Sequence, residues 1–223
     1  MSAQERPPAS DNTRDRIVRA AFQLFHEQGY NATGVATIVR EADVNPGSLY
    51  HFFESKDALL LGVLEFALRY LGEAVMNPVE AQTADPMDRV FTLLKHYRQR
   101  MERERCRLGC PIGNLALEVS DGNADARRLV HSNFENWASR VEGWLNDAGD
   151  RLPADVDRRQ LARFVLTVME GGLMQSRAAS HLGPFDESVA VLRDYFRRLD
   201  TQAPKARRRS RAARSARRRR TVR

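Results

Sequence analysis

A short segment near residue 50 brings together side chains that can contact a nucleic acid. Ser48, Tyr50 and His51 supply a hydroxyl, a phenol and an imidazole within four residues, and Gly47 allows a close approach of the backbone. An exposed helix in an ordinary bundle is the plain alternative. Yet such groups donate hydrogen bonds to phosphate oxygens or touch base edges, as a recognition helix in a DNA major groove must. The segment therefore predicts a DNA-reading helix.

The flanking residues predict a helix that presents these side chains. Asn45 is a good N-cap, and Pro46 suits the first helical position, where its missing N–H would have no partner anyway. Leu49 and Phe53 lie four residues apart and so share one face, which fits burial. We therefore expect a short helix from Pro46 to about Phe53, and we expect Ser55 to cap the helix that follows.

Two basic side chains nearby are further candidates for contacts with phosphates. Arg40 points away from the apolar side of the preceding helix, which consists of Val35, Ile38, Val39 and Ala42. Lys56 stands one residue into the next helix. For Lys56 the alternative is a solvated lysine with some role in the helix cap.

These features together resemble a known DNA-binding motif. The run over residues 44–57, Val-Asn-Pro-Gly-Ser-Leu-Tyr-His-Phe-Phe-Glu-Ser-Lys-Asp, with Gly29-Tyr30 and Thr33 before it, is similar to the helix-turn-helix of the tetracycline-repressor (TetR) family. The resemblance covers residues 13–60. Asp43 stands where the family usually has glycine in the turn, and Gly34 stands where it usually has a hydroxyl N-cap. Because aspartate tolerates the left-handed conformation, we expect the turn to persist, with Thr33 as the cap.

The resemblance implies an all-α fold and a function in transcription. It implies a three-helix helix-turn-helix domain over residues 13–54 and a larger helical domain for effector binding and dimerisation over residues 55–200. The implied protein is a homodimeric, ligand-responsive regulator, in the first instance a repressor, that binds a near-palindromic operator in double-stranded DNA. The predicted DNA contacts come from Thr33, Arg40, Asn45, Gly47, Ser48, Tyr50, His51 and Lys56.

Two cysteines four residues apart form the second informative segment. Cys110 immediately precedes Pro111, which starts a predicted helix, so the N–H groups and dipole of that helix should lower the pKa of its thiol. The segment also resembles the start of the effector domain in TetR members that respond to electrophiles or small unsaturated acids. Three roles stay open for Cys110: a small buried hydrophobe, a redox or electrophile sensor with Cys106 as resolving partner, or a metal ligand.

Aromatic and sulfur side chains on the later helices have two interpretations. They are core residues first, but with few polar groups among them they also fit the walls of a ligand cavity between helices. The candidates are Phe91, Tyr97, Phe134, Trp137, Met169 and Met174. No metal site and no cofactor is predicted.

The spacing of apolar residues predicts about nine helices and no strands. Period-2 alternation is absent throughout the sequence. The fourth helix should run from Ser55 to about Met76, where Asn77-Pro78 stops it, and residues 77–85 should form a loop. The other helices are expected over residues 13–28, 35–42 and 46–53, from Pro86 into the charged run 98–107, over 111–119, from after Asn123 to Gly149, and over 157–179 and 185–199.

The last two predicted helices carry more apolar residues than an end helix needs for its own packing. This excess predicts a homodimer built as a four-helix bundle. The residues concerned are Val165, Val168 and Leu173 in one helix, and Val189, Leu192, Tyr195 and Phe196 in the other. Gly171-Gly172 would allow a close approach of helices across the dimer seam.

Composition and charge set the remaining limits. The chain has 223 residues, 42% of them apolar, which is ample for a packed core. Residues 202–223 hold 11 of the 36 lysines and arginines and no acid, which leaves 25 basic and 29 acidic residues in the body. The absence of an apolar run of 18 residues or a signal sequence, together with only two cysteines, predicts a cytoplasmic protein.

The two ends of the chain are predicted to be disordered, over residues 1–12 and 201–223. The arginine-rich tail has two interpretations, a solvated segment or an arm that binds nucleic acid without sequence preference. An architectural DNA-binding protein that depends on this tail is the alternative function. An enzyme is disfavoured, because the sequence has no glycine-rich phosphate loop, no Gly-x-Ser-x-Gly elbow and no His-Glu-x-x-His motif.

Overall fold

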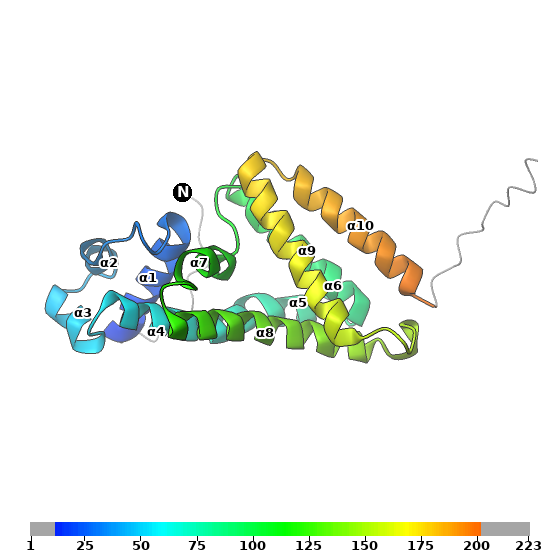
Figure 1. Cartoon of the computed structure of the whole chain (residues 1–223), viewed down its shortest axis with the longest axis horizontal. Helices are drawn as coiled ribbons and strands as arrows, with labels where there is room; N and C mark the ends of the chain where they lie inside the picture. Colours follow the sequence, from blue (N-terminus) through cyan, green and yellow to red (C-terminus); the bar gives the residue numbers. More distant parts are fainter. Residues whose placement is uncertain (1–11, 202–223) are drawn as a thin grey trace, which may run out of the picture.

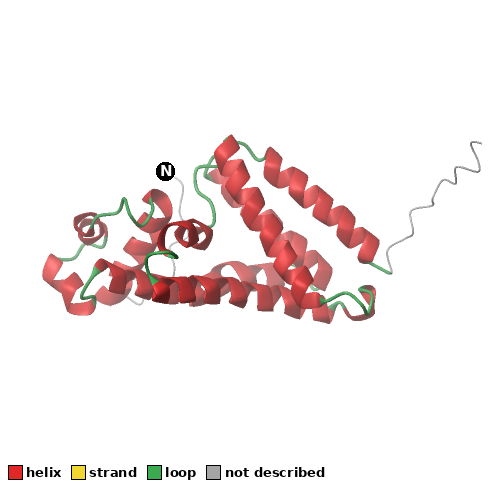
Figure 2. Cartoon of the chain, in the orientation of Figure 1, coloured by secondary structure: helices red, strands yellow, loops and turns green. Residues whose placement is uncertain are grey.

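The computed structural model describes residues 12–201, which fold entirely into helices and connecting turns (Figures 1 and 2). The all-α prediction is confirmed for this part of the chain. The predictions for the two ends concern residues outside it, apart from Asn12 and Thr201. The helices are α1 (Thr13–Gln28), α2 (Val35–Glu41), α3 (Pro46–Phe52), α4 (Lys56–Leu71), α5 (Asn77–Gln82), α6 (Pro86–Arg103), α7 (Pro111–Val119), α8 (Ala124–Asp147), α9 (Arg158–Ala179) and α10 (Gly183–Leu199).

Most of these helices begin at a side-chain cap that the sequence encodes. Asn12, Asn45, Ser55, Asn123 and Asp157 each accept a hydrogen bond from the backbone N–H three residues later, at 2.8 to 3.0 Å. Each such cap stabilises its helix by about 1 kcal/mol. The start points of α1, α3, α4, α8 and α9 therefore follow from local sequence.

The predicted stop at Asn77-Pro78 is wrong. The chain continues from α4 through a π-helical turn over Gly72–Met76 directly into α5. In this turn the N–H of Asn77 bonds the carbonyl of Gly72, five residues back, so the hydrogen-bond register shifts just before Pro78. Pro78 then lies in the first turn of α5, where its missing N–H costs least. Residues 77–82 are thus helix, and the loop is shorter than expected.

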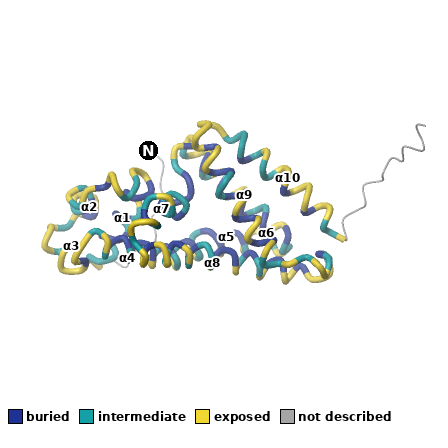
Figure 3. The backbone as a smooth tube through the Cα atoms, in the orientation of Figure 1, coloured by how far each residue is buried: buried dark blue, intermediate teal, exposed yellow. Residues whose placement is uncertain are grey.

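The helices form two groups, a head of α1 to α3 at one end of the molecule and a body of the remaining helices behind it. Figure 1 shows α2 and α3 at one extremity, α4 and α8 along the length of the molecule, and the α9–α10 hairpin over the opposite half. The buried apolar side chains form one continuous cluster, which includes Phe25 of α1, Leu60 of α4, Trp137 of α8 and Phe196 of α10. Because this cluster is continuous, the head and the body share one core. Figure 3 shows the exposed residues gathered around α3 and along α10.

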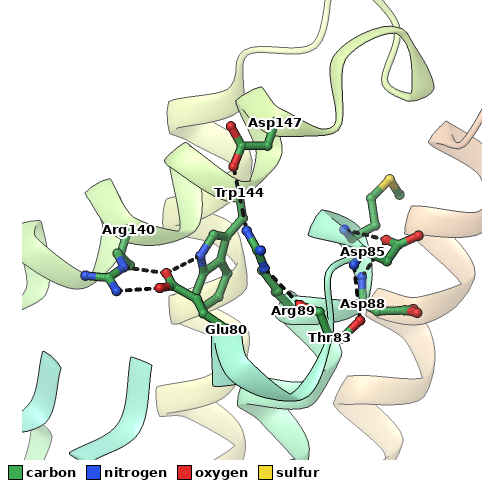
Figure 4. A network of polar contacts seen from close by, with 9 residues as sticks. Glu80, Thr83, Asp85, Asp88, Arg89, Arg140, Trp144 and Asp147 are labelled. Carbon is green, nitrogen blue, oxygen red and sulfur yellow. Dashed lines mark hydrogen bonds and ion pairs between the residues drawn. The ribbon is translucent and has the colours of Figure 1, made fainter. Parts of the chain in front are cut away.

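A polar network fastens α5 to α8 at the end of the body far from the head (Figure 4). Glu80 accepts hydrogen bonds from the Arg140 guanidinium at 2.5 and 2.6 Å and from the Trp144 indole at 2.7 Å. The hydrogen bonds from Arg140 hold the pKa of Glu80 below its usual value. None of the helices described combines the length and the apolar character needed to cross a membrane.

The close approach predicted from Gly171-Gly172 occurs within the protomer. A Cβ added at Gly172 would lie 3.0 Å from the ring of Phe185 and 3.3 Å from its Cα. Gly172 therefore lets the start of α10 pack tightly on α9. The prediction had assigned this contact to the dimer seam.

Candidate DNA-reading surface and effector region

α3 presents the predicted surface. Leu49 and Phe53 are buried, as expected, whereas Gly47, Tyr50 and His51 are exposed and Ser48 is half-buried. Tyr50 leaves 54% of its surface accessible, which is unusual for a side chain of this size and suits a contact made outside the protein.

Sequence reasoning missed Phe52 as part of this surface. Phe52 is 41% exposed, and its ring lies edge-on to that of His51, with the centroids 4.9 Å apart. The adjacent Phe53 takes an extended backbone conformation and turns into the core. Two consecutive aromatic residues cannot both face the core from one helical turn. The pair Phe52-Phe53 could therefore have predicted from the sequence that one of the two rings is exposed.

The turn between α2 and α3 has the predicted geometry. Asp43 adopts the left-handed conformation with φ of 51°, so aspartate replaces the usual glycine. The guanidinium of Arg16 on α1 donates to the Asp43 carbonyl at 3.4 Å. Arg40 is exposed on α2, as expected.

The role predicted for Thr33 is wrong. Gly34 is the N-cap of α2, and no side chain makes the capping hydrogen bond. The Thr33 hydroxyl instead donates to the carbonyl of Gly29 at 2.7 Å, and the whole residue is buried. It therefore braces the turn after α1 and is not placed to contact a phosphate.

Lys56 is also engaged within the protein. Its ammonium donates to the carbonyl of Tyr30 at 2.6 Å and lies 4.2 Å from the centroid of the Tyr30 ring. Partial burial lowers the pKa of Lys56, and the charge of Asp57 partly offsets this. The Tyr30 hydroxyl is hydrogen-bonded to Asp57. Lys56 thus joins α4 to the turn after α1, whereas a free phosphate contact was expected.

Two sets of hydrogen bonds connect the head to the body at a contact that we call the seam. The first set is formed by the buried His26. His26 of α1 donates from Nε2 to the carbonyl of Gly109 at 2.8 Å, and Arg100 of α6 approaches its Nδ1 at 3.3 Å. Since a carbonyl can only accept, Nε2 carries the proton and Nδ1 accepts from Arg100. Burial, and then the charge of Arg100, lower the pKa of His26 to about 4. His26 is therefore a neutral structural contact.

Glu118 near the end of α7 forms the other half of the seam. Its carboxylate accepts a hydrogen bond from the backbone N–H of Asn31 at 3.0 Å. Gly29, with φ of 88°, allows this approach, because a Cβ there would lie 2.7 Å from the carboxylate. Sequence reasoning missed both Glu118 and His26, since only tertiary structure brings them to the head.

The structure contradicts the expected activation of Cys110. Cys110 is the N-cap of α7, and its sulfur accepts the Gly113 N–H at 3.3 Å, yet the side chain is buried. Burial, followed by the charge of Glu170, raises the pKa of the Cys110 thiol well above its usual value. Burial also raises the pKa of Cys106. The cost of removing a thiolate from water therefore outweighs the stabilisation that the N-terminus of α7 gives it. Neither cysteine is an activated thiolate.

Beside Cys110 lies a buried carboxyl that sequence reasoning missed. Glu170 of α9 is hydrogen-bonded to the Cys110 thiol, and one of its oxygens is buried without a partner. Burial raises the pKa of Glu170 from 4.5 to about 7. The buried hydroxyl of Tyr97 also has no hydrogen-bond partner. Within residues 12–201, no cluster of three or more His, Cys, Asp or Glu side chains could hold a metal ion.

Of the apolar side chains predicted to line a cavity, Phe91 lies in a hollow. That groove has a volume of about 370 Å³ and lies between α6 and α10. A second hollow of about 430 Å³, near the seam, is lined mainly by charged residues such as Glu27 and Arg103. The other predicted residues lie elsewhere: Tyr97, Trp137 and Met169 are buried in the core, Phe134 is half-buried beside Trp137, and Met174 is exposed.

The apolar surface of α9 and α10 differs from the predicted set. Val165, Leu173, Leu192 and Phe196 are buried within the protomer, so they are not available to a partner. The exposed apolar side chains are Phe164 and Met174 on α9 and Val191 and Tyr195 on α10. The rings of Phe164 and Tyr195 meet edge-on, 6.2 Å apart, so this surface is continuous across both helices.

Known proteins resemble this chain over most of its length. Residues 17–63 match the bacterial regulatory proteins of the tetR family, and residues 86–192 match the tetracyclin repressor-like C-terminal domain. The chain is 28% identical to the HTH-type transcriptional regulator LmrA of Bacillus subtilis, with 84% of this chain and 98% of LmrA covered. It is 25% identical to the HTH-type transcriptional repressor DhaR of a Mycobacterium species, with 80% and 89% covered. The crystal structure of regulatory protein TetR from Rhodobacter sphaeroides aligns with a TM-score of 0.73 at 25% identity, covering 81% of this chain and 96% of that one.

Proposed function

Because the chain belongs to the tetR family of bacterial regulatory proteins and is a DNA-binding transcriptional regulator, we propose that it acts as a homodimeric repressor that a small molecule releases from its operator. Its relatives are regulators rather than enzymes, and one of them is named a repressor.

The exposed surface of α3 carries this proposal. Tyr50 and His51 stand on a helix whose opposite face is anchored by buried Leu49, so their positions are fixed before DNA arrives. The proposed DNA contacts are Arg40, Asn45, Gly47, Ser48, Tyr50 and His51, and Phe52 is added to them. Phosphate contacts from this set would position α3 in a major groove, and the aromatic and imidazole groups would meet base edges.

The apolar surface of α9 and α10 supports a dimer. Phe164, Met174, Val191 and Tyr195 expose large apolar side chains on two adjacent helices. Packing this surface against its copy in a second protomer would form a four-helix bundle with two-fold symmetry. Two-fold symmetry places two copies of α3 on a near-palindromic operator, with half-sites about one helical turn of DNA or a multiple of it apart.

Selection from a random DNA pool with the full-length protein tests this function. We expect enrichment of a near-palindromic sequence, and light scattering should give twice the 25.4 kDa of one chain. Deletion of residues 202–223 should leave the sequence preference intact, because base readout resides in α3. Loss of that preference on deletion would favour the architectural alternative, and a monomer at micromolar concentration would refute the dimer.

A further inference from the structure

The groove between α6 and α10 is held open by ion pairs at both ends. At one end Arg98 of α6 binds Asp186 of α10 through two hydrogen bonds of 2.7 and 2.9 Å. At the other end Arg151 bridges Asp85, the N-cap of α6, and Asp200, the C-cap of α10, at 2.6 and 2.9 Å. The two helices run antiparallel between these clamps, so the groove is formed before any ligand binds.

The lining between the clamps is apolar and of a size for a small molecule. Phe185 forms part of the buried wall, and Phe91 and Val189 are half-buried at the opening. The volume of about 370 Å³ falls in the range of about 300–1,000 Å³ that small-molecule sites occupy. An aromatic ring or a branched chain can lie against these side chains.

Two cations at this groove lack acidic partners. Lys95 of α6 and Arg193 of α10 line the groove, and neither forms an ion pair within the part of the chain that the structure describes. The Arg193 guanidinium lies 4.0 Å from the centroid of the Phe91 ring, which leaves its N–H groups free for an anion. The Arg98 charge is neutralised by Asp186.

The acidic residue Asp88 makes the charge along the groove uneven. Asp88 lies one turn before Phe91 along α6, and Lys95 lies one turn after it, so the negative and positive ends of the groove are separated by the apolar wall. Arg193 lies over the Phe91 ring, between Asp88 and Lys95, so an anionic group is attracted to the space between Lys95 and Arg193 and is repelled from the Asp88 end.

The groove lies on the side of α10 that faces away from the proposed dimer surface. Val191 and Tyr195 on the exposed apolar face are each two residues from Val189 or Arg193, and two residues correspond to about 200° around a helix. A dimer that buries Val191 and Tyr195 would leave the groove open.

We propose that this groove binds a small organic anion, with a carboxylate or sulfonate between Lys95 and Arg193 and an aromatic or branched apolar body against Phe91 and Val189. This rests on the proposed function, because the groove would be the effector site of the regulator. The same helix that carries Lys95 also carries Arg100, which contacts His26 of the head. A ligand that tightens α6 against α10 thus acts on a helix in direct contact with the DNA-reading part.

Fluorescence titration of the full-length protein with 8-anilinonaphthalene-1-sulfonate, an apolar sulfonate, tests the proposal. The double variant Lys95→Gln, Arg193→Gln should bind this probe about tenfold more weakly or worse, since charge-assisted hydrogen bonds to the sulfonate are lost. The control Arg103→Gln, Arg197→Gln removes the same charge from the same helices outside the groove, and it should bind like the wild type. Val189→Trp fills the groove without a change of charge and should also abolish binding.

Equal affinity of wild type and the Lys95, Arg193 variant would overturn the proposal, as would an equal loss in the control variant or a wild type that does not bind. Circular dichroism checks that each variant is folded. The titration contains no DNA, so a failure of this proposal is distinguishable from a failure of operator binding, which the selection experiment measures with the untreated protein.

Discussion

Replacement of Glu170 by glutamine should stabilise the protein at high pH and have little effect in acid. Burial raises the pKa of Glu170 from 4.5 to about 7, so the folded protein keeps a proton that the unfolded chain has released across this window. The contribution of Glu170 to stability is therefore fully present below pH 4.5 and is lost as the pH rises to about 7. At about 1.4 kcal/mol for each pKa unit, the ionised carboxylate costs up to about 3 kcal/mol at pH 8. Glutamine retains the shape and carries no charge.

Urea denaturation at fixed protein concentration, at pH 4 and pH 8, measures this difference. Glu170→Gln should exceed the wild type by up to about 3 kcal/mol in unfolding free energy at pH 8, and the two should nearly coincide at pH 4. Glu187→Gln serves as the control, because Glu187 is an exposed carboxyl on α10. Parallel stability curves for wild type and Glu170→Gln across this pH range would refute the assignment of a buried, protonated Glu170.

Three further predictions follow from the head and its seam with the body. Tyr50→Ala should weaken operator binding by about 1–2 kcal/mol, the scale of a hydrogen bond to a charged group, and fluorescence anisotropy with the selected operator measures it; an unchanged affinity would remove α3 from the reading surface. Glu118→Leu should speed hydrogen exchange of the Asn31 amide and weaken operator binding, because it removes the acceptor of that amide. Glu118→Gln keeps an acceptor, so the slow exchange and the operator affinity should both be retained. Equal exchange rates in the two variants would contradict the role of this contact. Cys110 in the folded protein should react with N-ethylmaleimide much more slowly than in urea, because it is buried with a raised pKa; rapid labelling of the native state, with Cys110→Ser to assign it, would restore the thiol-sensor hypothesis.

Sequence predicted the local features of the fold well. The caps at Asn45 and Ser55 and the left-handed turn at Asp43 depend on neighbouring residues, and all three are confirmed. Pro78 was misjudged, because a π turn upstream admits proline into a continuing helix, and no propensity rule signals that turn.

The errors at the candidate sites share a different cause. The pKa of Cys110 depends on how deeply its thiol is buried and on Glu170, which lies 60 residues away in the chain. Thr33 and Lys56 have types that suit DNA contacts, but tertiary packing directs them to Gly29 and Tyr30. Residue type predicts what a side chain can bind, and only packing decides which partner it meets.

The short helix α7 gives the head a second attachment. α4 joins the head to the body covalently. α7 carries two further contacts about 6 Å apart along its axis: Asn114 is bonded to Arg177 of α9 at 3.1 Å, and Glu118 is bonded to the head at Asn31. Together with the contacts of His26 to Gly109 and Arg100, this link connects the head to α9 as well as to α6. A displacement of α9 would therefore reach the head through Asn114, α7 and Glu118, and in a dimer it would change the distance between the two copies of α3.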